Sequence, residues 1–167
     1  MTEGQDSAAG GFVNTDESRA ALDPAVLTIW VVVNLVNVLQ AIGFVSRVDG
    51  FGVQRAVGLM IVALLIPAGL ALVRFVKERA GWRLVAGPAA FAAFVAFMIV
   101  IEYVFDVEFR SPSKPAILVP FVGLFFGSIV LMGAPMYRIN QRLWRVTALT
   151  AAVLLAAMIF AMSRGVG

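Results

Sequence analysis

Five apolar stretches dominate this sequence of 167 residues and constrain its fold more than any other feature. A helix of about 20 apolar residues crosses a hydrocarbon core about 30 Å thick. Membrane β-strands are shorter and alternate apolar with polar side chains, whereas these stretches are apolar on every side. The sequence therefore predicts an all-α integral membrane bundle of five transmembrane helices. The predicted spans are about residues 25–46, 56–73, 84–105, 116–137 and 146–163.

The residues before the first span differ sharply from it in composition. Residues 1–23 are rich in Gly, Ala, Ser and acidic side chains, with hardly any apolar run, which predicts a short disordered acidic tail. The first helix has a clear start, because Asp23 can accept hydrogen bonds from free backbone N–H groups while Pro24 occupies the first helical position. We therefore divide the chain into this tail and a transmembrane domain over residues 24–164.

Pro67 falls in the middle of the second predicted span, with Gly69 just after it. A proline at this position removes one backbone hydrogen bond, so the sequence predicts a kink. We interpret the kink as a static bend, since nothing in the sequence indicates a second state.

The composition excludes most kinds of enzyme site. Hydrophobic residues make up 61% of the chain and charged residues 14%, against about 45–50% and about 25% in soluble domains. The chain has no Cys and no His, which removes disulfides, thiolate chemistry, His-ligated haem, most zinc sites and Ser-His-Asp catalysis. We therefore expect no catalytic residues, no cofactor and no metal site.

The thirteen basic residues lie almost wholly at the ends of the apolar stretches, as topology signals and headgroup anchors do. This placement argues against nucleic acid as a partner and makes the lipid bilayer the expected one. The bias in basic residues predicts a cell-membrane protein with its N-terminus in the cytoplasm and its C-terminus outside. The N-terminal side carries Arg19, Arg74, Lys77, Arg79, Arg83, Arg138, Arg142 and Arg145, and the other side carries Arg47, Arg55, Arg110, Lys114 and Arg164.

Small residues at four-residue spacing mark two of the spans. The fourth contains Gly123 and Gly127, and the fifth contains Ala148, Ala152 and Ala156. Lipid provides no hydrophobic drive between helices, so close contact at small residues is a principal source of helix association. We expect these faces to pack within the chain. The alternative is that they form a homo-oligomer or bind a membrane protein partner.

The first span carries three amide side chains on one flank. Asn34, Asn37 and Gln40 recur every three residues, which places them on neighbouring positions of one helix face. Lipid is a poor environment for that flank, so we expect it to face other helices.

The third span ends in Glu102, Asp106 and Arg110, which recur every four residues and therefore share a helix face. The first and third spans run in the same direction, which puts Gln40 and Glu102 at similar depth. These two spans can therefore assemble a polar site inside the membrane, on the side of the 47–55 loop.

A carboxylate inside a span is costly, by about 2.5–3.5 kcal/mol at the helix centre and less near the ends. Glu102 is therefore expected to face the bundle, to pair with a cation or to be protonated. The nearby cations are Arg47, Arg55 and Arg110. One interpretation makes Glu102 a site for a proton, a cation or the head of a lipid-like ligand, with Tyr103 nearby. The other makes it interhelical glue together with the amides.

Two segments resemble parts of small multi-pass membrane proteins of bacteria and archaea that carry no assigned activity. These segments are GFVSRVDGFGVQR, residues 43–55, and IEYVFDVEFR, residues 101–110. The resemblance implies that an acid-rich end of the third helix followed by Phe109 and Arg110 is a family feature. It implies no substrate, cofactor or mechanism.

Three functional hypotheses follow from these patterns. The first is an accessory, assembly or self-associating membrane subunit, because small-residue faces are abundant and catalytic residue types are absent. The second is a small transporter or carrier that binds a proton, a cation or an amphiphile at the polar cluster around Glu102. The third is a membrane enzyme that uses Glu102, Asp106 and Glu108 with a hard divalent cation. The sequence favours the first.

Overall fold

The computed structural model describes residues 23–47, 52–105 and 114–164, apart from the side chains of Glu102 and Tyr103. Every regular element in these ranges is a helix. The elements are α2 (Pro24–Ser46), α3 (Gly52–Ala63), α4 (Leu65–Lys77), α5 (Trp82–Ile99), the π-helical turn η1 (Val100–Val104), α6 (Pro115–Ile139) and α7 (Gln141–Ser163). The tail predicted at the N-terminus lies outside the described residues, except for Asp23.

The predicted fold class is confirmed. Five helices are long and apolar enough to cross a membrane, with α3 and α4 together forming one of them. The start of α2 is also as predicted, because the Asp23 side chain accepts a hydrogen bond from the Ala25 backbone N–H at 2.7 Å and Pro24 is the first helical residue.

The second span is broken where the sequence predicts a kink. Pro67 has no N–H to donate to the Ala63 carbonyl, four residues earlier, and α3 ends at Ala63. Leu64 separates it from α4, which begins at Leu65. The helix is therefore interrupted just before Pro67, at the place where the missing hydrogen bond predicts a kink.

The last helix begins earlier than its apolar stretch. Asn140 caps it, with Oδ1 accepting hydrogen bonds from the backbone N–H groups of Arg142 at 2.9 Å and Leu143 at 3.4 Å. A polar side chain that satisfies free N–H groups can start a helix before the apolar span, and α7 accordingly starts at Gln141.

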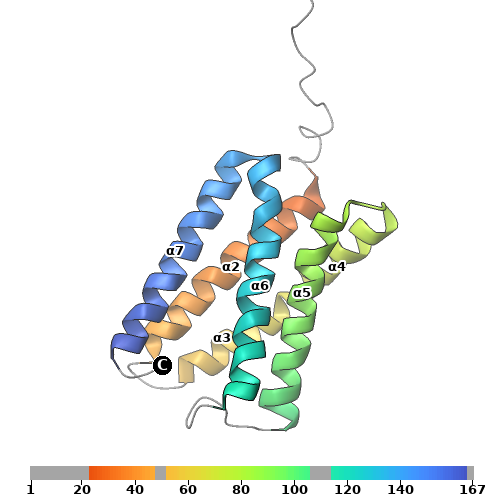
Figure 1. Cartoon of the computed structure of the whole chain (residues 1–167). Helices are drawn as coiled ribbons and strands as arrows, with labels where there is room; N and C mark the ends of the chain where they lie inside the picture. The colour runs from red at the N-terminus through yellow and green to blue at the C-terminus, as the bar shows by residue number, and fades with distance from the viewer. Residues whose placement is uncertain (1–22, 48–51, 106–113, 165–167) are drawn as a thin grey trace, which may run out of the picture.

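The central helix of the bundle is α2, which packs against α3, α4, α6 and α7 (Figure 1). The helices α5 and α6 also pack against each other. The helices α6 and α7 meet at the Asn140 junction and move apart toward the other end of the bundle (Figure 1).

The outward faces of the helices are apolar. Several large side chains that point away from the bundle are between 63% and 70% exposed: Ile66, Leu70, Val119, Leu149 and Ile159. Large apolar side chains this exposed on several helices suit contact with lipid chains.

Candidate functional site

The polar flank of α2 meets α7. Asn34 Nδ2 donates a hydrogen bond to Thr147 Oγ1 at 3.2 Å, and Asn34 Oδ1 accepts one from the Thr150 hydroxyl at 2.8 Å. Asn37 Nδ2 donates to the same Thr150 oxygen at 3.0 Å. We call these four side chains, Asn34, Asn37, Thr147 and Thr150, the polar seam.

The backbone of each helix holds its own members of the polar seam in place. Asn34 Nδ2 also donates to the carbonyl oxygen of Trp30 at 2.7 Å, one turn back along α2. The Thr147 hydroxyl donates to the carbonyl oxygen of Leu143 at 3.2 Å, one turn back along α7. Trp30 Nε1 donates to that same Leu143 oxygen at 3.0 Å and so extends the contact toward the helix starts.

The two helices run in parallel with a constant register. Three hydrogen-bonded pairs along this contact are each separated by 113 residues in sequence. The pairs are Trp30 with Leu143, Asn34 with Thr147, and Asn37 with Thr150. A register fixed by three such pairs specifies one packing of α7 on α2.

The polar seam is largely removed from the surroundings, since Asn37 is 0% exposed and Thr147 is 5% exposed. Asn37 Oδ1 has no hydrogen-bond partner in the part of the chain that the structure describes. The polar seam contains only neutral amides and hydroxyls, so it cannot carry charge or exchange protons near neutral pH. Its chemistry is hydrogen bonding between helices, which supports the glue interpretation for Asn34 and Asn37.

The sequence predicted that the amides face other helices and offered the third span as a possible partner. Among the described residues, the hydrogen-bond partners of Asn34 and Asn37 on other helices lie on α7. Thr147 and Thr150 were missed because single hydroxyls in an apolar span attract little notice. Their three-residue spacing matches that of Asn34 and Asn37, and this match was the available signal.

The third amide of the first span, Gln40, and the cation Arg47 lie toward the C-terminal end of α2. Gln40 is half-buried, one turn beyond Asn37. Arg47 Nε donates to Gln54 Oε1 at 2.8 Å, and its guanidinium carbon lies 4.6 Å from the centre of the Phe44 ring. Arg47 therefore links the end of α2 to the start of α3.

The acidic end of the third span begins in a π-helical turn. Glu102 and Tyr103 belong to η1, in which the Phe105 N–H donates to the Val100 carbonyl oxygen at 3.0 Å, five residues back. The side chains of both residues lie outside the described part of the chain, and so do Asp106, Glu108 and Arg110. The pairing of Glu102 and the divalent-cation hypothesis therefore stay predictions.

In the part of the chain that the structure describes, the predicted small-residue faces do not pack against another helix. A Cβ added at Gly123 or Gly127 meets nothing within 4 Å, and Ala148, Ala152 and Ala156 are all exposed. The expectation of intrachain packing is therefore wrong for these positions. The physical reason is helical phase, because on each helix these residues lie opposite the buried side.

Other glycines make the close contacts instead. A Cβ at Gly87 of α5 would lie 2.8 Å from the backbone of Leu131 and Met132 on α6. A Cβ at Gly133 of α6 would lie 3.1 Å from Thr147 Cγ2 on α7. Neither contact could be predicted from the spacing of small residues, because neither glycine has another small residue four positions before or after it.

Comparison with protein-family models, with curated proteins and with solved structures finds no match to this chain. The resemblance of residues 43–55 and 101–110 therefore contributes no site residue.

Proposed function

We propose that this chain is a membrane protein that associates with copies of itself, and that the contacts between copies lie along the outward face of α6. One observation supports the proposal above the others: Gly123 and Gly127 lie on that face with open space where side chains would be. A second helix can approach the backbone closely at such a pair, and van der Waals contact at small residues stabilises helix pairs in lipid.

The low helix propensity of these glycines supports the same proposal. Glycine in a helix is about 0.8–1.0 kcal/mol less favourable than alanine, and no contact described within the chain offsets that cost at Gly123 or Gly127. The outward face of α7 offers a second surface of the same kind through Ala148, Ala152 and Ala156. Contacts with another copy are the proposed compensation.

The test is the oligomeric state of matched glycine variants in bilayers, measured by crosslinking and by single-molecule photobleaching. Gly127→Leu fills the outward face of α6 without touching the core, so we expect mostly monomers whose melting temperature is no lower than that of the wild type. Gly69→Leu is the control, because Gly69 on α4 also has open space around it but lies outside the two small-residue faces. A monomeric wild-type protein, or equal oligomers in both variants, would contradict the proposal.

An accessory role gives a different result in the same experiment. A membrane protein that copurifies at fixed stoichiometry, and that is lost specifically in Gly127→Leu, identifies this face as a surface for a different subunit. Self-association then fails while the interaction role stands.

The proposed orientation places the N-terminus in the cytoplasm. Seven described basic residues gather at the end of the bundle where α4 joins α5 and α6 joins α7, which we call the basic end. They are Arg74, Lys77, Arg79, Arg83, Arg138, Arg142 and Arg145. The chain has no Cys, so Glu78→Cys and Ser163→Cys each create a unique label. We expect an impermeant maleimide to label position 163 in intact cells and position 78 only after permeabilisation.

A second candidate function is a carrier with Glu102 at its binding site. The specific observation in its favour is the π-helical turn, since such turns occur frequently at functional sites. Glu102→Gln removes the charge and nearly preserves the shape. Loss of pH-dependent transport or ligand binding at normal expression would support a carrier, whereas a lower melting temperature alone would assign the residue to helix packing.

A further inference from the structure

The connection between α4 and α5, residues 77–81, which we call the α4–α5 turn, holds a strained backbone position. Arg79 has a φ of 52°, in the left-handed region that a residue with a side chain adopts at a cost. The Arg79 N–H donates a hydrogen bond to the Val76 carbonyl oxygen at 3.2 Å. The Ala80 N–H donates to the Phe75 carbonyl oxygen at 2.8 Å, which completes a type of helix end where glycine is the usual residue at position 79. Strain at an arginine in this position points to a role for its side chain.

The side chains of Arg79 and Lys77 form no ion pair in the part of the chain that the structure describes. Both residues are exposed. The described acidic side chains are Asp23 and Glu78, and both already pair with Arg74, at 3.2 Å and 2.8 Å. The α4–α5 turn therefore presents two exposed cations without an acidic partner among the described residues, and their charge attracts an acidic segment.

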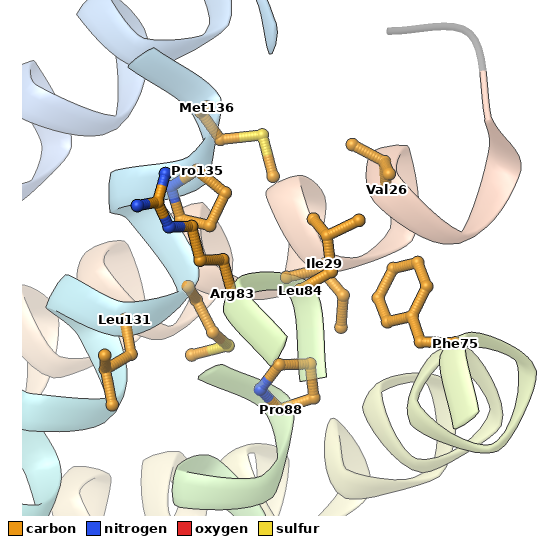
Figure 2. Close-up of a pocket in the computed structure, with 10 residues that line it drawn as sticks. Val26, Ile29, Phe75, Arg83, Leu84, Pro88, Leu131, Pro135 and Met136 are labelled. Atoms are coloured by element: carbon orange, nitrogen blue, oxygen red, sulfur yellow. The ribbon is translucent and has the colours of Figure 1, made fainter. Parts of the chain in front are cut away.

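The N-terminal segment of the chain joins the bundle close to this turn. The ion pair between Asp23 and Arg74 ties the first described residue to α4. Figure 2 shows Val26 and Ile29, at the start of α2, around the same small pocket as Phe75 near the end of α4. Residues 1–22 carry one cation, Arg19, and four acidic side chains, Glu3, Asp6, Asp16 and Glu17. An acidic segment is therefore attached next to the two exposed cations of the turn.

We propose that the α4–α5 turn is a docking surface for an acidic peptide segment, and that its occupant is residues 1–22 of the same chain. Asp16 and Glu17 lie seven and six residues before Asp23, so an extended segment reaches about 20 Å from the ion pair at Asp23. Arg79 follows Arg74 by five residues, which is about 7 Å along a helix. The tether at Asp23 keeps the carboxylates concentrated near the turn, which offsets the weakness of single exposed ion pairs. The docked segment covers cations that otherwise attract anions from outside the chain.

Carbodiimide crosslinking of the full-length chain in mild detergent tests this contact, because the reagent joins a carboxylate to an amine only where the two groups touch. The chain has two lysines, Lys77 in the α4–α5 turn and Lys114 at the start of α6, at the opposite end of the bundle (Figure 1). Lys114 is therefore a built-in control. At low ionic strength we expect peptides that join Asp16 or Glu17 to Lys77, and none that join them to Lys114. Salt at about 1 M, where charges are screened beyond about 3 Å, should remove most of the Lys77 crosslinks.

Two variants of Arg79 separate docking from a purely structural role. Arg79→Gly relieves the strained position and should raise the melting temperature, yet it should lower the yield of Lys77 crosslinks by about two- to fivefold, the effect of one exposed ion pair. Arg79→Gln keeps the strain and should lower the yield by the same factor. The matched control is Arg142→Gln, which removes an exposed charge of the basic end at the start of α7. It should leave the yield unchanged.

Three results would overturn the proposal. Equal losses in Arg79→Gln and Arg142→Gln would mean diffuse attraction to the whole basic end. The absence of Lys77 crosslinks would leave the turn to anions from outside the chain, such as lipid headgroups. In a mixture of isotopically light and heavy copies, crosslinks that join light to heavy peptides would assign the docked segment to a second copy. The intrachain crosslinks should also persist in Gly127→Leu, so the outcome is independent of association through α6.

Discussion

The two halves of α6 use small residues for opposite purposes. Near the basic end, Gly133 lies against α7, and Gly87 of α5 abuts the α6 backbone. In the half that begins at Pro115, Gly123 and Gly127 point away from the bundle and leave open space. One helix therefore closes the bundle at one end and offers an unoccupied surface at the other.

This difference shows that phase, more than spacing, decides what a small residue contacts. The buried side of α6 follows Phe125, Ser128 and Met132, and Phe125 packs its ring 5.3 Å from that of Phe94 on α5. Gly123 and Gly127 fall on the opposite side of the same turns. Their four-residue spacing is equally compatible with either side, so the motif by itself does not identify its partner.

The largest expected effect is at Gly87. In Gly87→Ala the new Cβ would lie 2.8 Å from backbone atoms of Leu131 and Met132, which cannot rotate away as a side chain can. We expect the two helices to separate, with a loss of about 1–3 kcal/mol in unfolding free energy. Thermal unfolding in detergent measures this loss, and an unchanged midpoint would show that the α5–α6 contact yields easily.

The polar seam is expected to come next in size. Thr150→Val keeps the shape of the side chain but removes the hydroxyl shared by Asn34 and Asn37. We expect a loss of about 0.6 kcal/mol for each interhelical hydrogen bond, the average measured in membranes, with about 1.7 kcal/mol as the maximum. Thr28→Val is the control, because the Thr28 hydroxyl donates only within α2, to Pro24. Equal losses in the two variants would mean that the polar seam contributes nothing between helices.

A smaller effect, this time an increase in stability, is expected in the half of α6 that carries Gly123 and Gly127. Gly127→Ala adds a methyl group where nothing lies within 4 Å, so the helix gains up to about 1 kcal/mol of intrinsic propensity. The melting temperature of the monomer should rise slightly while association between copies weakens. Stronger association would show that the outward face tolerates a larger residue and does not pack through close backbone contact.

The smallest net change is expected at Gly133, where two effects oppose each other. In Gly133→Ala the new Cβ would lie 3.1 Å from Thr147 Cγ2, a side-chain atom that can shift by a few tenths of an ångström. The cost of that shift offsets the propensity gain of about 1 kcal/mol. The unfolding midpoint should stay close to that of the wild type. A loss of unfolding free energy as large as that of Gly87→Ala would show that the Thr147 side chain cannot move away from the new Cβ.

Features that depend on neighbours along the chain could be predicted from the sequence. The apolar spans, the Asp23 cap and the break before Pro67 are each determined within a few residues. The start of α7 at Gln141 was missed, although its cap at Asn140 is equally local, because the apolar stretch begins only near residue 146.

Features that depend on which helices become neighbours could not be predicted in the same way. The residues around Asn34 do not indicate that its neighbour in space will be Thr147, which is 113 residues later in the sequence. The open surroundings of Gly123 likewise follow from the positions of α5 and α7 around α6. Which of five similar helices become neighbours is decided by packing over the whole bundle. A local sequence pattern does not contain that information.

The constant register between α2 and α7 has a consequence for biogenesis. Asn34 and Asn37 leave the ribosome as part of α2, but their partners on α7 follow 113 residues later. Until then the two amides must be shielded by an insertion factor, by water or by a temporary neighbour. The polar seam can therefore form only after α7 has been inserted, and a chain truncated before α7 would leave both amides without these partners.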